Sequence, residues 1–255
     1  MSIAACAETV RQMDPDRFLS VMAASPALRA DLFVLYAFNI EVARAPWASN
    51  EEMIAEMRLQ FWRDVVDAID EGREAHRHEL VAPLRQVIRD HRLPVKILQQ
   101  IIEARRWDIY RDAFADESAF ARYIDHTSGN LMWQAARVVG TQDNFEADVR
   151  EYAYCVGVSN WLVAVPELVA RGRTPLLDGS DAGVLALSQD ALTRMAKVKK
   201  RLPKQAAPAL RAGWLAGGVL KAAIGNPERV KTGRLQRSEF QRRSGLLLRS
   251  MTGRW

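Results

Sequence analysis

Apolar residues recur along this chain at three- and four-residue steps, with polar residues between them. Between residues 27 and 44, the apolar side chains that share one helix face are Leu28, Leu32, Leu35, Tyr36 and Ile40. The segment 51–70 repeats the pattern and begins with acids, which the positive end of a helix dipole favours. Because no run alternates apolar and polar residues as a strand does, the pattern predicts an all-α fold.

Proline, glycine and short polar clusters separate the predicted helices. The remaining predicted helices span 79–92, 94–114, 117–139, 144–170, 188–202 and 205–224, with a basic C-terminal helix at about 235–255. The loop between the fourth and fifth of these covers 172–183. No repeat of fixed period is present, and 255 residues suffice for one core. We therefore expect residues 1–255 to form a single-domain helical bundle.

Composition favours a reducing, cytoplasmic environment. The two cysteines, Cys6 and Cys155, lie far apart and indicate neither a disulfide framework nor a zinc site. The first residues do not resemble a signal peptide. The longest nearly apolar stretch, 209–225, is interrupted by Arg211 and Lys221 and is short for a bilayer, so we expect no transmembrane helix.

Positive charge is concentrated in the second half of the chain. The net charge is +5, and residues 197–204 and 229–255 contain few acids. Such a segment attracts anionic surfaces. Near the C-terminus, arginines flank apolar residues, which suits a helix on the anionic inner face of a membrane or, equally, a terminal helix packed on the bundle. The candidate membrane or partner contacts are Arg237, Arg242, Arg243, Arg249 and Trp255.

The sequence contains no motif for a metal site, a nucleotide-binding loop or a catalytic triad. The four histidines have no metal-ligand spacing, and no glycine-rich phosphate loop, Ser-His-Asp arrangement or nucleotide fingerprint is visible. Asp64, Asp67 and Asp70 are spaced three residues apart, but they fall on the polar side of their helix and indicate a solvated face. The basic residues do not alternate with stacking aromatics, so we expect no nucleic-acid partner.

Four strings occur in a characteristic order along most of the chain. They are "LFVLYAFNIEVARA" at 32–45, "MRLQFWRDVVDAI" at 57–69, "DHTSGNLMWQAARVVG" at 125–140 and "YAYCVGVSNWLVAVPELVARGRTPLL" at 152–177. In order and spacing the chain resembles the squalene/phytoene synthase family over roughly residues 15 to 225. The resemblance implies a bundle of the isoprenoid synthase type with a central cavity. Active members join two prenyl diphosphates head to head.

The resemblance also implies where metal ions would bind in an active member. Two aspartate-rich stretches face each other across the cavity and hold Mg²⁺, which stabilises the departing diphosphate. The first stretch follows a "YAF" string, and the corresponding window here, 43–47, contains no acid and one cation, Arg44. In the second, "NWLVAVPELVARGR" keeps Asn160 and Glu167 but loses both outer aspartates. We expect Pro166 to break or kink this helix.

Both losses together predict no metal and no cofactor. The strings "YAFNIE" and "MRLQFW" with an aspartate-poor second region are similar to the subgroup that includes the mitochondrial assembly factor of respiratory complex I. That similarity implies a pseudo-enzyme whose partners are complex I subunits or assembly intermediates at the membrane. The alternatives are an active prenyl transferase using prenyl diphosphates and Mg²⁺, and a lipid-binding scaffold unrelated to respiration.

The candidate cavity or ligand-binding residues are Tyr36, Asn39, Glu41, Asn160, Glu167, Arg171 and Arg173. Glu41 is either a pocket acid or a helix carboxylate paired with a basic neighbour such as Arg44. Arg171 and Arg173 match an Arg-Gly-Arg that binds diphosphate in active members, and here fit either a phosphate or lipid headgroup or a surface loop. We interpret Asp108 and Tyr110 as a buried structural pairing. The retained apolar helix faces favour a bound isoprenoid or other lipid that is not turned over.

Overall fold

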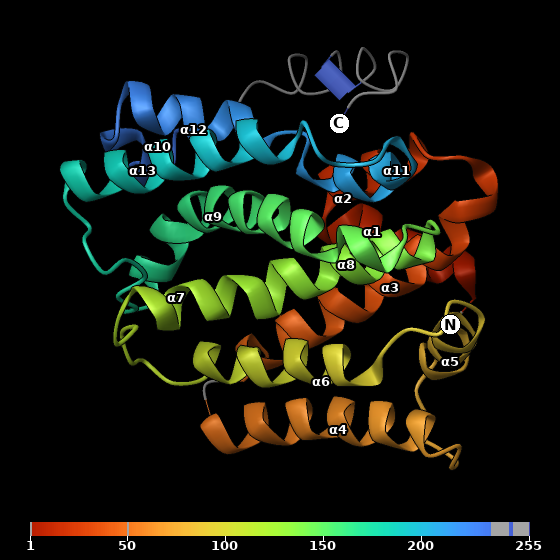
Figure 1. Cartoon of the computed structure of the whole chain (residues 1–255). Helices are drawn as coiled ribbons and strands as arrows, with labels where there is room; N and C mark the ends of the chain where they lie inside the picture. Colours follow the sequence, from red (N-terminus) through yellow and green to blue (C-terminus); the bar gives the residue numbers. More distant parts are fainter. Residues whose placement is uncertain (1, 50, 236–244, 247–254) are drawn as a thin grey trace.

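The computed structural model describes residues 2–49, 51–235, 245–246 and 255 (Figure 1). These residues form helices and turns and contain no β-strand, so the all-α prediction is confirmed. The first helices are α1 (Ile3–Met13), α2 (Pro15–Met22), α3 (Pro26–Arg44), α4 (Glu52–Asp70), α5 (Val81–Asp90) and α6 (Val95–Ala104). The later ones are α7 (Glu117–Ile124), α8 (Asn130–Val138), α9 (Glu146–Ala170), α10 (Asp181–Val198), α11 (Ala207–Leu210), α12 (Ala216–Gly225) and α13 (Glu228–Lys231).

Helix α9 runs through the middle of the bundle (Figure 1). It packs against α7, α8 and the π-helical turn Asp125–Gly129 on one side and against α10, α12 and α13 on the other. Its apolar residues are distributed around the whole helix rather than along one stripe, as expected for a helix covered on all sides. On the far side of α7 and α8 lie α6 and then α4 (Figure 1).

Short polar side chains fix where several helices begin. Asp14 accepts a hydrogen bond from the backbone N–H of Arg17 and starts α2, while Asp116 does the same for α7. Ser180 caps α10 in this way, so that helix begins at Asp181. The prediction that 172–183 is loop and that the helix begins at 188 was therefore wrong at this end.

Other boundaries also differ from the prediction. Helices α1 and α2 were not predicted, because only Cys6 and Val10 of α1 are buried and the apolar period there is weak. The predicted helix 94–114 ends at Ala104, followed by the 3₁₀ turn Arg105–Asp108. The predicted helix 205–224 is divided into α11, a 3₁₀ turn and α12. Pro166 does not break α9, which continues to Ala170.

One helical segment among the described residues, Asp143–Ala170, is long and apolar enough to cross a membrane by length and composition. It contains α9, and 56% of its most apolar window is buried inside the bundle. The prediction of no transmembrane helix considered only the segment 209–225, whereas the more apolar stretch is this one. A core helix of a bundle has the same length and composition.

Candidate functional site

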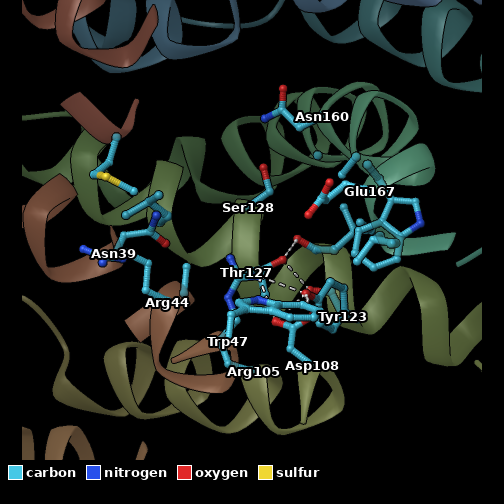
Figure 2. Close-up of a pocket in the computed structure, with 18 of the residues that line it drawn as sticks. Asn39, Arg44, Trp47, Arg105, Asp108, Tyr123, Thr127, Ser128, Asn160 and Glu167 are labelled. Carbon is cyan, nitrogen blue, oxygen red and sulfur yellow. Dashed lines mark hydrogen bonds and ion pairs between the residues drawn. The ribbon is translucent and has the colours of Figure 1, made fainter. Parts of the chain in front are cut away.

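A cavity of about 570 Å³ opens beside α9 (Figure 2). Its walls come from α1, α2, the C-terminal end of α3, the 3₁₀ turns Ala45–Trp47 and Arg105–Asp108, the junction of α7 with α8, and α9. Apolar side chains supply much of the lining, including Ile124, Leu131 and Leu168. Cavities of this size bury small-molecule ligands in many proteins.

The cavity brings together the two sequence segments that the resemblance placed opposite each other. Ala43, Arg44 and Trp47 line it from the first segment. The candidate residues Asn39, Asn160, Glu167 and Arg171 also line it. Figure 2 shows Asn39 and Arg44 on one side and Glu167 on the other. Tyr36, Glu41 and Arg173 are not part of the lining.

Tyr36 supports the cavity wall from behind. Its side chain is fully buried in α3, and burial raises its pKa to about 12. The Arg17 guanidinium, which does line the cavity, lies 5.0 Å from the centre of the Tyr36 ring. Tyr36 therefore holds a lining residue rather than facing a ligand itself.

Glu41 is half-buried on α3, outside the cavity. Among the residues that the structure describes, it forms no ion pair with Arg44, so the local pairing considered from the sequence is not present. Arg44 is exposed at the end of the same helix, and the cavity contains its side chain but not that of Glu41.

Arg171 and Arg173, the two arginines of the Arg-Gly-Arg string, have different partners. Arg171 Nε donates to Glu167 Oε1 at 2.7 Å, and its guanidinium lies 4.7 Å from the centre of the Trp47 ring. Arg173 is only 8% exposed and donates to the backbone carbonyls of Ile109, at 3.1 Å, and Asp108. Burial lowers the pKa of Arg173. Arg173 thus stabilises the backbone at Asp108 and Ile109, whereas the side chain of Arg171 lines the cavity.

A buried polar cluster forms the floor of the cavity. Tyr123 donates its hydroxyl hydrogen to Asp108 Oδ1 at 3.0 Å, and Arg105 Nη1 donates to Asp108 Oδ2 at 3.2 Å and to the Tyr123 hydroxyl at 2.9 Å (Figure 2). Asp108 is 2% exposed, and burial raises the pKa of Tyr123. The buried pairing expected for Asp108 is present, but Tyr110 is exposed and donates instead to Glu56.

Aromatic rings line and back the same end of the cavity. Trp107 and Phe114 stack with their centroids 4.3 Å apart, and Trp161 packs edge-on against Tyr123 at 5.1 Å. The Trp161 indole N–H donates to the carbonyl of Pro175 at 2.8 Å, which orients its ring at the cavity wall. Sequence reasoning missed Arg17, Arg105 and Tyr123, because residues from three separate elements meet only in the fold.

The C-terminal candidates are mostly outside the described residues. This applies to Arg237, Arg242, Arg243 and Arg249, and to most of the helix predicted at 235–255. The described Leu246 is buried, and Trp255 packs against the core. Lys199 Nζ donates to the backbone carbonyl of Trp255 at 3.2 Å. Leu246 and Trp255, the described residues of this segment in these contacts, therefore pack on the bundle.

Acids are scarce at the cavity. Asp108 and Glu167 line it, and each is already bonded to an arginine. Across the described part of the chain, no group of three or more His, Cys, Asp or Glu side chains lies close enough together to hold a metal ion. The cavity is therefore lined by more arginine than carboxylate.

A family model described as squalene/phytoene synthase matches residues 10–241. The chain belongs to the squalene/phytoene synthase family. Two solved structures of enzymes have the same fold over nearly all of both chains. A dehydrosqualene synthase in complex with a ligand has a TM-score of 0.77 at 11% identity and covers 98% of this chain and 95% of that one. Squalene synthase HpnC from Alicyclobacillus acidocaldarius has a TM-score of 0.61 at 16% identity and covers 99% and 94%. The predicted fold of the isoprenoid synthase type is thus confirmed.

Curated relatives come from the predicted subgroup of the squalene/phytoene synthase family. NADH dehydrogenase (ubiquinone) complex I, assembly factor 6 of Bos taurus is 28% identical over 138 residues, which cover 54% of this chain and 41% of that protein. The Drosophila melanogaster homolog is 25% identical over 195 residues, which cover 74% and 58%. The match spans about two to three fifths of the length of these relatives. The resemblance to the subgroup is confirmed.

Proposed function

We propose that this chain is a non-catalytic member of the squalene/phytoene synthase family that assists the assembly of respiratory complex I, the NADH dehydrogenase. The observation that carries the assembly role is the similarity to proteins named complex I assembly factor 6 in mammals and to their insect homolog. Its partners would be complex I subunits or assembly intermediates.

The donor set of the cavity supports the non-catalytic part of the proposal. A Mg²⁺ ion takes near-octahedral oxygen ligands, usually from carboxylates, substrate phosphates and water. Of the two acids at the cavity, Asp108 is enclosed by Arg105 and Tyr123, and Glu167 is paired with Arg171. These residues do not fit a magnesium ion.

The positive charge in the window 43–47 also supports a non-catalytic protein. Where the resemblance would place carboxylates, Arg44 lines the cavity between Ala43 and Trp47. A guanidinium repels a divalent cation and attracts anions directly. A diphosphate leaving group would lack the metal ions that stabilise its charge in a metal-dependent transfer.

We place the protein on the inner face of the cytoplasmic membrane as a peripheral protein. Lys221, Arg229 and Arg234 are exposed around α12 and α13, and none forms an ion pair within the described residues. In the sequence they precede residues 236–255, which contain more basic than acidic residues. Each basic residue near an anionic bilayer adds about 1 kcal/mol of attraction.

Deletion of the gene in its own organism tests the assembly role. We expect loss of assembled complex I and of NADH:quinone oxidoreductase activity, with succinate dehydrogenase activity unchanged and recovery on re-expression of the wild-type chain. The readouts are native gel electrophoresis and membrane enzyme assays. Normal complex I content in the deletion strain would rule out the assembly role.

The alternative is an active prenyl transferase, which is favoured by membership of the squalene/phytoene synthase family and by the fold shared with dehydrosqualene and squalene synthases. We expect no diphosphate release when the purified protein is incubated with farnesyl or geranylgeranyl diphosphate and Mg²⁺, beside an active family member as control. Formation of a condensed hydrocarbon would establish the alternative and contradict the non-catalytic assignment.

A further inference from the structure

Three cations surround a hollow on the surface where α12 meets α13, far from the cavity beside α9. The hollow has a volume of about 560 Å³, and Lys221, Arg229 and Arg234 line it. Among the described residues, none of these three side chains forms an ion pair or a hydrogen bond. Glu228 is the one acid among the described lining residues, so positive charge exceeds negative charge in the hollow.

The chain around α13 fixes the two arginines of this hollow at the surface. Val230 is fully buried and Leu235 is 2% exposed, so both anchor the turn to the core, while Arg229 and Arg234 beside them are exposed. The backbone N–H of Arg234 donates to the carbonyl of Arg229 at 2.9 Å, which brings these two residues together. Gly233 adopts a φ of +68°, a conformation that glycine enters without strain. The hollow is therefore built by the fold.

Apolar surface lies directly beside the hollow. Lys221 also lines a groove of about 490 Å³ between α10 and α12, together with Leu192, Met195 and Leu215. Leu192 and Leu215 are only partly buried. Cations next to apolar side chains are typical of protein surfaces at the boundary between lipid headgroups and acyl chains. A free anion or a nucleic acid would use the cations and leave the apolar side chains without a partner.

The opposite side of the bundle has a different surface. Figure 1 shows α10, α12 and α13 on one side of the molecule and α4 on the other. At the start of α4, the exposed charged residues are Glu51 and Glu52, and Met53 and Met57 beside them are 75% and 66% exposed. Anionic lipid repels carboxylates and attracts cations. The two sides therefore differ in their affinity for an anionic bilayer.

We propose that the side of the bundle formed by α10, α12 and α13 is the face that contacts the membrane, with Lys221, Arg229 and Arg234 bound to phosphate groups of anionic phospholipids. This inference rests on the proposed peripheral location and adds which face the protein turns toward the bilayer. Helix α4 then lies on the side away from the membrane, where its exposed methionines are accessible to other proteins.

Co-sedimentation of the purified full chain with vesicles tests the role of the three cations. The anionic vesicles contain phosphatidylglycerol and phosphatidylcholine, and vesicles of phosphatidylcholine alone serve as the neutral comparison. The wild type is expected to bind the anionic vesicles in preference to the neutral ones. The triple variant Lys221→Ala, Arg229→Ala, Arg234→Ala is expected to bind the anionic vesicles at least about tenfold more weakly than the wild type.

A matched control separates this face from a general charge effect. The control variant is Arg58→Ala, Arg77→Ala, Arg89→Ala, which removes the same charge from exposed residues of α4, α5 and the loop between them. Because salt screens charges that lie far from the bilayer, its affinity is expected to stay within about twofold of the wild type. Thermal unfolding of both triple variants confirms that they are folded.

A fluorophore that brightens in an apolar environment locates the face directly. It is attached to Gly225→Cys at the hollow or, as the control, to Met57→Cys on α4. An added Cβ at Gly225 would have nothing within 4 Å, and the native Cys6 and Cys155 are buried. With anionic vesicles, we expect the label at residue 225 to brighten and the label at residue 57 to stay unchanged.

Four results would overturn the inference: no binding to the anionic vesicles, equal weakening by the two triple variants, brightening at residue 57 without brightening at residue 225, or tighter binding to a DNA duplex than to the vesicles. Binding to vesicles through another face would leave the proposed peripheral location intact, whereas absence of all vesicle binding would contradict both. The assembly role is decided separately, by the complex I content of the deletion strain.

Discussion

At the cavity floor, the side chains of Asp108, Arg105 and Tyr123 are held by hydrogen bonds to one another. Asp108 receives hydrogen bonds from Tyr123 and Arg105, and the side chains of Asp108 and Arg105 are 2% and 19% exposed. A buried ion pair is costly to break from one side, because the charge that remains loses both its partner and its hydration. The stability of the cavity therefore depends on this acid more than on the exposed Glu167.

Asp108→Asn is expected to lower the free energy of unfolding by about 3–5 kcal/mol, because it leaves the Arg105 guanidinium without a counter-charge. Tyr123→Phe removes the hydrogen bond that Tyr123 donates to Asp108 and the one that it accepts from Arg105, but keeps the ion pair, and should cost about 1–2 kcal/mol. Urea denaturation followed by circular dichroism measures both. Equal losses for the two variants would show that the ion pair carries no special weight.

At this scale the sequence predicts some of the site and misses the rest. Asn39, Asn160, Glu167 and Arg171 could be selected because each falls in a recognisable string, and all four line the cavity. Arg17, Arg105 and Tyr123 belong to no such string. Their position depends on how α2, a 3₁₀ turn and α7 pack, which local periodicity does not encode.

Among the elements, α9 and the π-helical turn Asp125–Gly129 pack together and both line the cavity. Gly157 lies at this contact, and a Cβ atom there would come within 2.8 Å of Ser128 Cβ and 2.5 Å of Ile124 Cγ2. Ser128 Oγ also donates to the carbonyl of Ala153 on α9 at 2.9 Å. The two elements are therefore too close for any side chain at residue 157.

Gly157→Ala should destabilise the protein by about 1–3 kcal/mol through overpacking, although alanine is the better helix former by about 1 kcal/mol. The matched control is Gly217→Ala on α12, where the added Cβ atom would lie 3.8 Å from its nearest neighbour, Met195 Sδ, and would make no clash. We expect Gly217→Ala to be neutral or slightly stabilising. Differential scanning calorimetry distinguishes the two, and similar melting temperatures would contradict the packing argument.

The existence of a helix was predictable from the sequence where the helix is long. The predicted 27–44, 51–70 and 144–170 correspond closely to α3, α4 and α9. Boundaries failed where a tertiary contact decides them: the helix after Val95 stops at Ala104, ahead of the turn that buries Asp108. Local propensity favours continuing that helix, whereas burial of the polar cluster requires the turn.

For the molecule as a whole, ion pairs join the central helix to the later half of the chain. Arg194 of α10 binds Glu151 of α9 through two hydrogen bonds of 2.7 and 2.8 Å, and Arg201 binds Asp148. The bond to Arg194 lowers the pKa of Glu151 from its ordinary value of 4.5. Both partners are about one-third exposed, so water and salt weaken the interaction.

Because the pKa of Glu151 is lower in the folded state than in the unfolded state, the stabilisation is complete above about pH 4.5 and is lost as the pH falls through the folded pKa. Glu151→Gln is therefore expected to cost about 1 kcal/mol at pH 7 and progressively less below pH 4.5. Denaturation curves of both proteins between pH 3 and pH 8 provide the measurement. A difference in stability that stays constant down to pH 3 would exclude this linkage.

The position of α9 in the chain has a consequence for synthesis on the ribosome. The helices that cover one side of it, α7 and α8, precede it, whereas α10, α12 and α13 follow it. When residue 170 has just emerged from the ribosome, the segment that is long and apolar enough to cross a membrane therefore still lacks the helices that cover its other side. Until α10 and α12 emerge, we expect the uncovered apolar surface of this helix to attract chaperones and the membrane-insertion machinery. Correct folding of this protein thus includes a competition in time between completing the bundle and capture of α9.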